Sequence, residues 1–199
     1  KTSNSISELY DSRDEMAVIT RNVIWNNEFL NTYTDKEKDI LGKYSSSLFT
    51  LNTFYTANKT IVGRTIKKDT EKFLLDYWNN VVEHMAQWQE LQHREITKVD
   101  LRESYIATQS IVIQALGRIG NYYVSHQSEM KDGLQELERI NWSRSAKQWY
   151  MRAVGKNGRI ITSKKAALLI SNVIKKELGI ALSAEELNAE EALKKTIKD

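Results

Sequence analysis

The stretch Ile111-Val112-Ile113-Gln114-Ala115-Leu116 is apolar on nearly every side when it is drawn as a helix. A helix of this kind is buried by neighbours on several faces, so we expect this stretch at the centre of the fold. Gly117 and Gly120 follow it one helical turn apart. Each glycine costs a helix roughly 1 kcal/mol relative to alanine. We therefore expect a second helix to approach closely at these two positions.

Helical patterns continue on both sides of this centre. The helix that contains it is predicted to run from Thr97 to Ser125, and an earlier helix from Lys68 to Leu91 has one apolar stripe at the 3.6-residue period. Residues 48–56 fit a strand by composition and a helix by spacing, and we favour the helix. The other predicted helices cover residues 7–25, a short stretch through 39–41 after an N-cap at Thr34, and residues 130–140, 145–151, 164–178 and 184–198.

These patterns predict a mainly α fold, namely a helical bundle with a small C-terminal helix–β-hairpin–helix unit. Residues 1–127 would form the bundle and residues 128–199 the smaller unit packed on it, unless the two form one continuous domain. The hairpin is predicted at Gly155-Lys156-Asn157-Gly158, because Asn-Gly supplies the two positive φ values of a tight turn. Gly179 is expected to end the helix that follows, and Ser183 with Glu186 to form the capping box of the last helix.

The composition excludes several classes of site. The 199 residues include no cysteine, which removes disulfides, thiolate zinc sites and cysteine nucleophiles, and favours a reducing, cytoplasmic location. No apolar run approaches the roughly 18 residues of a membrane span. His84, His93 and His126 lack the spacing of metal ligands, and no phosphate-binding loop or nucleophile elbow occurs. We therefore expect no enzyme activity, no cofactor and no metal.

Residues 139–176, the basic segment, hold ten basic side chains and no Asp or Glu. Because the whole chain has 29 basic and 26 acidic side chains, the segment carries +10 and the remainder −7. Lysine and arginine near a phosphate release condensed counterions, which drives binding to polyanions. The predicted DNA-binding residues are Arg144, Lys147, Arg152, Lys156, Arg159, Lys164 and Lys165. The other interpretations are a solvated face, or a face that docks on the acidic remainder of the chain or on a partner.

Two tryptophans lie inside the basic segment. Trp142 and Trp149 are seven residues apart, and we expect them to anchor a small core and not to stack on bases, because buried aromatic side chains dominate small cores. Arg144 lies between them and would pair with a phosphate or cap the segment.

Several motifs together are similar to one protein family. They are Leu9-Tyr-Asp-Ser-Arg-Asp14, Leu48-Phe-Thr-Leu51, Gln114-Ala-Leu-Gly-Arg-Ile-Gly120, Ile140-Asn-Trp-Ser-Arg-Ser145, Trp149, Arg152-Ala153, Gly158-Arg159, Ser163-Lys164 and Asn172-Val-Ile-Lys-Lys-Glu-Leu-Gly179. The combination resembles the C-terminal part of the DndB family of DNA sulfur-modification (phosphorothioation) proteins, also called the DGQHR family. The Asp-Gly-Gln-His-Arg signature itself is absent. Because it lies upstream in the family, we expect this chain to be the C-terminal helical part of a longer protein.

The resemblance implies a bacterial cytoplasmic protein that represses transcription by binding double-stranded promoter DNA of the phosphorothioation gene cluster, and not the enzyme that transfers sulfur. A second hypothesis is an interaction or assembly module that contacts other proteins of the modification system without touching DNA. Catalysis is the third hypothesis, because it would need the part of the protein that lies upstream.

Overall fold

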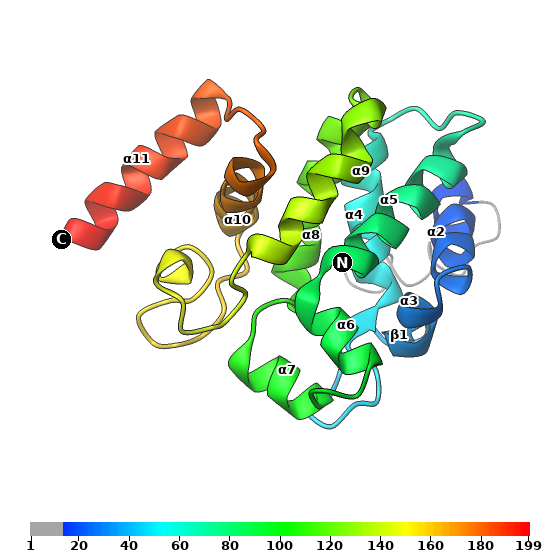
Figure 1. Ribbon diagram of the computed structural model, residues 1–199, viewed down its shortest axis with the longest axis horizontal. Coiled ribbons are helices and arrows are strands. Elements are labelled where there is room, and N and C mark those ends of the chain that lie inside the picture. Colours follow the sequence, from blue (N-terminus) through cyan, green and yellow to red (C-terminus); the bar gives the residue numbers. More distant parts are fainter. Residues whose placement is uncertain (1–13) are drawn as a thin grey trace.

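The computed structural model describes residues 14–199, and this part of the protein is mainly helical (Figure 1). The predicted mainly α fold class is therefore confirmed. The elements are α2 (Glu15–Trp25), α3 (Glu28–Tyr33), β1 (Thr34–Asp35), β2 (Phe49–Thr50), α4 (Leu51–Val62), α5 (Thr70–His84), α6 (Ala86–Gln92), α7 (Lys98–Ser104), α8 (Ser110–Val124), α9 (Gln127–Gln135), the 3-10 turns η1 (Glu136–Arg139) and η2 (Lys147–Trp149), α10 (Lys164–Leu178) and α11 (Ala184–Lys198).

Helix α8 lies at the centre, with α4 and α10 packed against it (Figure 1). A Cβ added at Gly117 would come within 3.1 Å of the Ala57 carbonyl oxygen on α4. A Cβ added at Gly120 would come within 2.7 Å of Ile61 Cγ1 and 2.9 Å of Tyr77 Cε1. The helix approach that the two glycines predicted is therefore confirmed.

A chain of buried polar contacts ties α5 and α4 to α2. The Trp78 indole Nε1 donates to Asn58 Oδ1 over 2.8 Å, and Asn58 Nδ2 donates to Thr20 Oγ1 over 3.0 Å. All three side chains have no exposed surface. Because each partner is satisfied inside an apolar surrounding, this chain fixes the relative positions of the three helices.

The prediction of one continuous helix over residues 68–91 is wrong, because the helix is interrupted at Met85, between α5 and α6. Met85 has an extended ψ of 102° and is fully buried. The Gln89 side chain donates to the Val82 carbonyl oxygen over 2.7 Å and so satisfies an acceptor that the broken helix leaves open. The apolar stripe predicted for this region is buried in both helices, from Phe73 to Trp88.

The predicted helix over residues 97–125 is likewise two helices, α7 and α8. Tyr105 is extended and forms an antiparallel bridge with Ser143, and the Ile106 amide donates to the Trp142 carbonyl oxygen over 2.9 Å. Hydrogen bonds to a distant segment therefore replace helical ones between Ser104 and Ser110.

Two predictions near the start of the chain need correction. Thr34 does not cap a helix, because Thr34–Asp35 forms a short strand that pairs in parallel with Phe49–Thr50. The helix predicted over residues 48–56 begins only at Leu51, after the Thr50 side chain caps it. Of the helix predicted over 7–25, residues 7–13 lie outside the described part, and α2 begins at Glu15.

The C-terminal predictions are partly confirmed. Helices α10 and α11, the left-handed Gly179 (φ 76°) and the Ser183–Glu186 capping box are as predicted. The helix predicted over 130–140 is α9 followed by η1, and the one over 145–151 shrinks to η2. The hairpin is reduced to a turn closed by one antiparallel bridge between Val154 and Ile160.

We expect Gly120→Ala to destabilise the protein although alanine favours helix. The added methyl group would overlap Ile61 and Tyr77, and overpacking of this kind costs about 1–3 kcal/mol. The expected loss in melting temperature is several degrees, measured by circular dichroism. A rise in melting temperature, as for a glycine on an open helix face, would contradict the close packing at this position.

Candidate polyanion-binding surface

Residues 140–163 of the basic segment form a loop between η1 and α10, at one end of α10 (Figure 1). Trp142 and Trp149 stack inside this loop, with ring centroids 5.3 Å apart and an interplanar angle of 7°. Both are buried, and the Trp149 indole donates to the Asn141 carbonyl oxygen over 2.7 Å. The prediction that the tryptophans anchor a core is confirmed, and their faces are not open to bases.

The turn at the tip of the loop presents two cations. The Gly158 amide donates to the Gly155 carbonyl oxygen, and the Gly155 amide donates to that of Arg159, each over 2.9 Å. Within this turn only Gly158 has a positive φ, of 77°, so the tight turn with two positive φ values that Asn157-Gly158 predicted is wrong. The Asn157 side chain instead accepts from the Arg159 amide over 3.0 Å. Lys156 and Arg159 are exposed on this turn.

Five of the seven predicted DNA-binding side chains are exposed, and we call them the cationic face. Among the described residues, none of the five has a carboxylate within ion-pair distance. They are Lys147, Lys156, Arg159, Lys164 and Lys165.

Part of the cationic face borders two adjoining hollows. An open hollow of about 510 Å³ is lined by Lys156 and Arg159, and a smaller one of about 150 Å³ by Lys165. Met151 and Ile161 line both hollows. Three residues of the cationic face, two from the loop and one from α10, therefore line these two hollows.

Lys164 and Lys165 are the first two residues of α10. The Ser163 side chain caps this helix by accepting from the Ala166 amide over 3.1 Å. The first turn contains no acidic residue. Cations are disfavoured at a helix N-terminus, where the partial charge is positive. The two lysines therefore add to the positive partial charge at this end of α10, which suits an anion.

Arg144, the sixth predicted residue, is engaged within the fold. Its Nη2 donates to the Arg102 carbonyl oxygen over 3.1 Å, and its amide donates to the Ser104 carbonyl oxygen over 2.9 Å. Arg144 therefore caps the C-terminal end of α7, where the helix dipole favours a cation.

Arg152, the seventh, is nearly buried, with 12% of its side chain exposed. Its Nη1 and Nη2 donate to the two carboxylate oxygens of Glu190 on α11 over 2.6 and 2.8 Å. Its Nε donates to the Gln148 carbonyl oxygen and its Nη1 to that of Leu169. These four hydrogen bonds from Arg152 all go to acceptors of the same chain.

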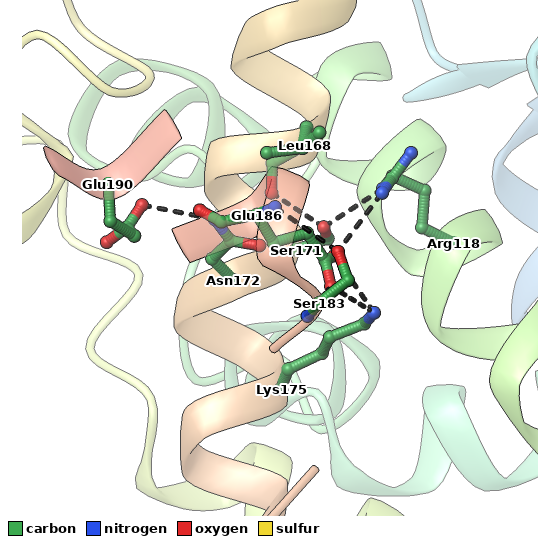
Figure 2. Close-up of polar contacts among 8 residues, drawn as sticks. All are labelled: Arg118, Leu168, Ser171, Asn172, Lys175, Ser183, Glu186 and Glu190. Atoms are coloured by element: carbon green, nitrogen blue, oxygen red, sulfur yellow. Dashed lines mark hydrogen bonds and ion pairs between the residues drawn. The ribbon is translucent and has the colours of Figure 1, made fainter. Parts of the chain in front are cut away.

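A second carboxylate of α11, Glu186, is the centre of a buried charge cluster (Figure 2). Its side chain is 2% exposed and accepts from Lys175 Nζ over 2.9 Å and from Arg118 Nη2 over 3.3 Å. The Ser183 amide donates to it over 2.9 Å, and Arg118 also donates to Ser171 Oγ over 3.1 Å. The cluster joins α8, α10 and α11.

The surroundings of the two carboxylates change their pKa values. Burial alone would raise the pKa of Glu186, but the Ser183 amide, Lys175 and Arg118 outweigh it and lower the pKa to about 2. Burial would also raise the pKa of Glu190, but the hydrogen bonds from Arg152 and Asn172 outweigh this effect and lower the pKa below its ordinary value. Both carboxylates are therefore held ionised by their partners.

This cluster was not found from the sequence. Arg118 and Glu186 are 68 residues apart, and Arg152 and Glu190 are 38 residues apart. The one local signal was the capping box that contains Glu186, which indicates a helix start and no tertiary partner.

The histidines do not form a metal site with other side chains of the described residues. His84 Nδ1 lies 2.9 Å from Glu138 Oε1, and within residues 14–199 no group of three or more His, Cys, Asp or Glu side chains could hold a metal ion. In the same range no helix has both the length and the apolar character needed to cross a bilayer.

We expect Glu186→Gln to lower the free energy of unfolding in a pH-dependent way. The folded-state pKa near 2 lies below the ordinary 4.5, so the carboxylate stabilises the fold above about pH 4.5 and loses this contribution as the pH falls towards 2. The gap between wild type and variant should be on the order of 3 kcal/mol at neutral pH and should close in acid.

Urea unfolding at several pH values would measure this gap. Glu185→Gln is the matched control, because Glu185 is exposed beside Glu186 on the same helix. A gap for Glu186→Gln that stays constant from pH 6 to pH 2 would contradict the assignment.

Comparison with known proteins identifies the family of this chain. A family model described as DndB, DNA-sulfur modification-associated, matches residues 1–181. No curated protein and no solved structure matches the chain. The matched range covers the cationic face, Arg118, Arg152 and Lys175, and stops before α11. The chain therefore belongs to the DndB family of proteins associated with DNA sulfur modification.

Proposed function

We propose that the chain is a DNA-binding module that represses transcription of a phosphorothioation gene cluster, and that the cationic face contacts duplex DNA mainly through phosphates. The observation that carries the proposal is the set of five exposed cations without a carboxylate partner among the described residues. The membership in a family associated with DNA sulfur modification supports the proposal, because such a family works on or near DNA.

The start of α10 supports an anionic ligand. Lys164 and Lys165 lie in a first turn that already carries a positive partial charge, so they destabilise the isolated helix by several tenths of a kcal/mol. A bound phosphate would reverse the sign of this contribution, because backbone amides and both lysines would then face a negative charge.

The buried tryptophan pair limits the mode of binding. Since Trp142 and Trp149 stack on each other inside the loop, they have no free face for unpaired bases. Contacts by lysine and arginine to phosphates bind a duplex without reading its sequence. We therefore propose strongly salt-dependent binding to double-stranded DNA, in the cytoplasm, by a module that is not the sulfur-transferring enzyme.

A second candidate is an assembly module, in which an acidic partner protein of the modification system docks on the same face. The ion pairs of Glu190 with Arg152 and of Glu186 with Lys175 favour it, because in both pairs a cation of the basic segment already binds a carboxylate of a helix. Under this candidate duplex DNA would not bind at low salt, and an acidic protein would.

We expect Lys156→Glu with Arg159→Glu to weaken duplex binding at least tenfold, which corresponds to about 1.4 kcal/mol. Each lost phosphate contact should also lower the slope of log affinity against log salt by about 1. Fluorescence anisotropy with a labelled promoter duplex at several salt concentrations would measure both quantities.

The matched control is Lys72→Glu with Lys131→Glu, which changes the net charge equally on exposed residues outside the basic segment. Equal losses in the two double variants would mean that overall charge, and not the cationic face, attracts DNA. An unchanged affinity and salt slope in Lys156→Glu with Arg159→Glu would refute the proposed contacts.

A further inference from the structure

Helix α11 places two carboxylates on cations that belong to other elements. Glu186 pairs with Arg118 of α8 and Lys175 of α10, and Glu190 pairs with Arg152 of the basic segment. Figure 2 shows Arg118 and Lys175 converging on Glu186. Two of the ten cations of the basic segment are therefore neutralised by this one helix.

The acidic residues are confined to the half of α11 that makes these contacts. Its first eight residues hold four glutamates and no base, and its remaining seven hold three lysines and no acid. The acidic residues are Glu185, Glu186, Glu190 and Glu191, and the basic ones are Lys194, Lys195 and Lys198. The helix has nearly no net charge, yet it presents a negative half to the basic segment.

Arg152 has a second set of partners outside α11. The carbonyl oxygens of Gln148 and Leu169 accept from its Nε and Nη1, and neither residue belongs to α11. These bonds hold the guanidinium in place independently of α11. Glu190 occupies Nη1 and Nη2 in a bidentate pair, which is also the geometry in which a guanidinium binds phosphate.

Arg152 lies next to the cationic face. Arg152 and Lys165 line the same hollow of about 150 Å³, and Leu193 and Thr196 of α11 form part of its wall. Arg152 and Lys176 line a further groove of about 430 Å³ together with Glu190. Without α11 over them, Arg152 and Lys176 would extend the surface that includes Lys165.

The apolar contact of α11 is small. Its side chains of Leu187 and Ile197 are 53% and 47% exposed, and in α11 only Glu186 and Leu193 are buried. Figure 1 shows α11 at the edge of the protein beside α10. One buried leucine contributes little hydrophobic stabilisation compared with a helix that buries a full face. Ion pairs therefore supply much of the docking of α11, and a competing anion opposes them directly.

We propose that α11 is an autoinhibitory helix whose Glu190 occupies a phosphate site at Arg152, and that duplex DNA displaces this carboxylate when it binds. The inference rests on the proposed DNA-binding function and adds a second phosphate site to the cationic face. Displacement by DNA and docking of α11 are then coupled, so each weakens the other to the same extent.

The first test compares Glu190→Gln with Glu191→Gln. Both variants remove one negative charge from α11, but among the described residues Glu191 forms an ion pair with Lys194 of its own helix and not with a cation of the basic segment. Glu190→Gln should bind a labelled duplex roughly tenfold more tightly than wild type, within the range of ordinary coupling energies. Glu191→Gln should bind at most slightly more tightly. Equal affinities of Glu190→Gln and wild type would overturn the inference.

The second test uses the unaltered chain and hydrogen–deuterium exchange. Saturating duplex should make the backbone amides of α11 exchange severalfold faster, while those of α8 stay protected. Unchanged or slower exchange in α11 would overturn the displacement of α11, even if the Glu190 variant fails to fold.

The two proposals fail in different ways. If wild type binds duplex through Lys156 and Arg159 but Glu190→Gln binds no more tightly, only the autoinhibitory role is lost. If neither wild type nor Glu190→Gln binds duplex at low salt, the proposed function is lost together with the inference. Binding by Glu190→Gln alone would support both proposals.

Discussion

The fold depends on the burial of α8 on several sides. Gly117 and Gly120 let α4 approach so closely that a single added carbon would meet its backbone or side chains. On another side α10 packs against α8, and Arg118 of α8 reaches Ser171 and Glu186. The basic segment is therefore positioned from the core outward, since α10 carries its last third and the tryptophan pair holds its loop.

The sequence predicted those elements whose signals are local. The apolar α8, the capped α10 and α11 and the left-handed Gly179 follow from periodicity and capping within a few residues. The breaks at Met85 and Tyr105 follow no local signal, because neither position carries a glycine or proline. Hydrogen bonds to the Trp142 segment decide the second break, and such long-range competition overrides helix propensity.

In the candidate site, too, local sequence signals predicted some features and long-range contacts decide the others. The excess of cations between residues 139 and 176 is visible in the sequence, and the burial of Trp142 and Trp149 was predicted from it as well. Which cations remain free is decided by tertiary structure. Arg152 and Arg144 look equivalent to Lys156 in sequence, but one is held by Glu190 and the other caps α7.

The stacked tryptophans have a consequence for the thermodynamics of binding. Because Trp142 and Trp149 fix the loop in the free protein, little backbone entropy remains to be lost when a ligand contacts it. The electrostatic attraction between this preorganised loop and a ligand is then not offset by the cost of ordering the loop. Heat-capacity and enthalpy changes on binding should then contain no contribution from the ordering of this loop.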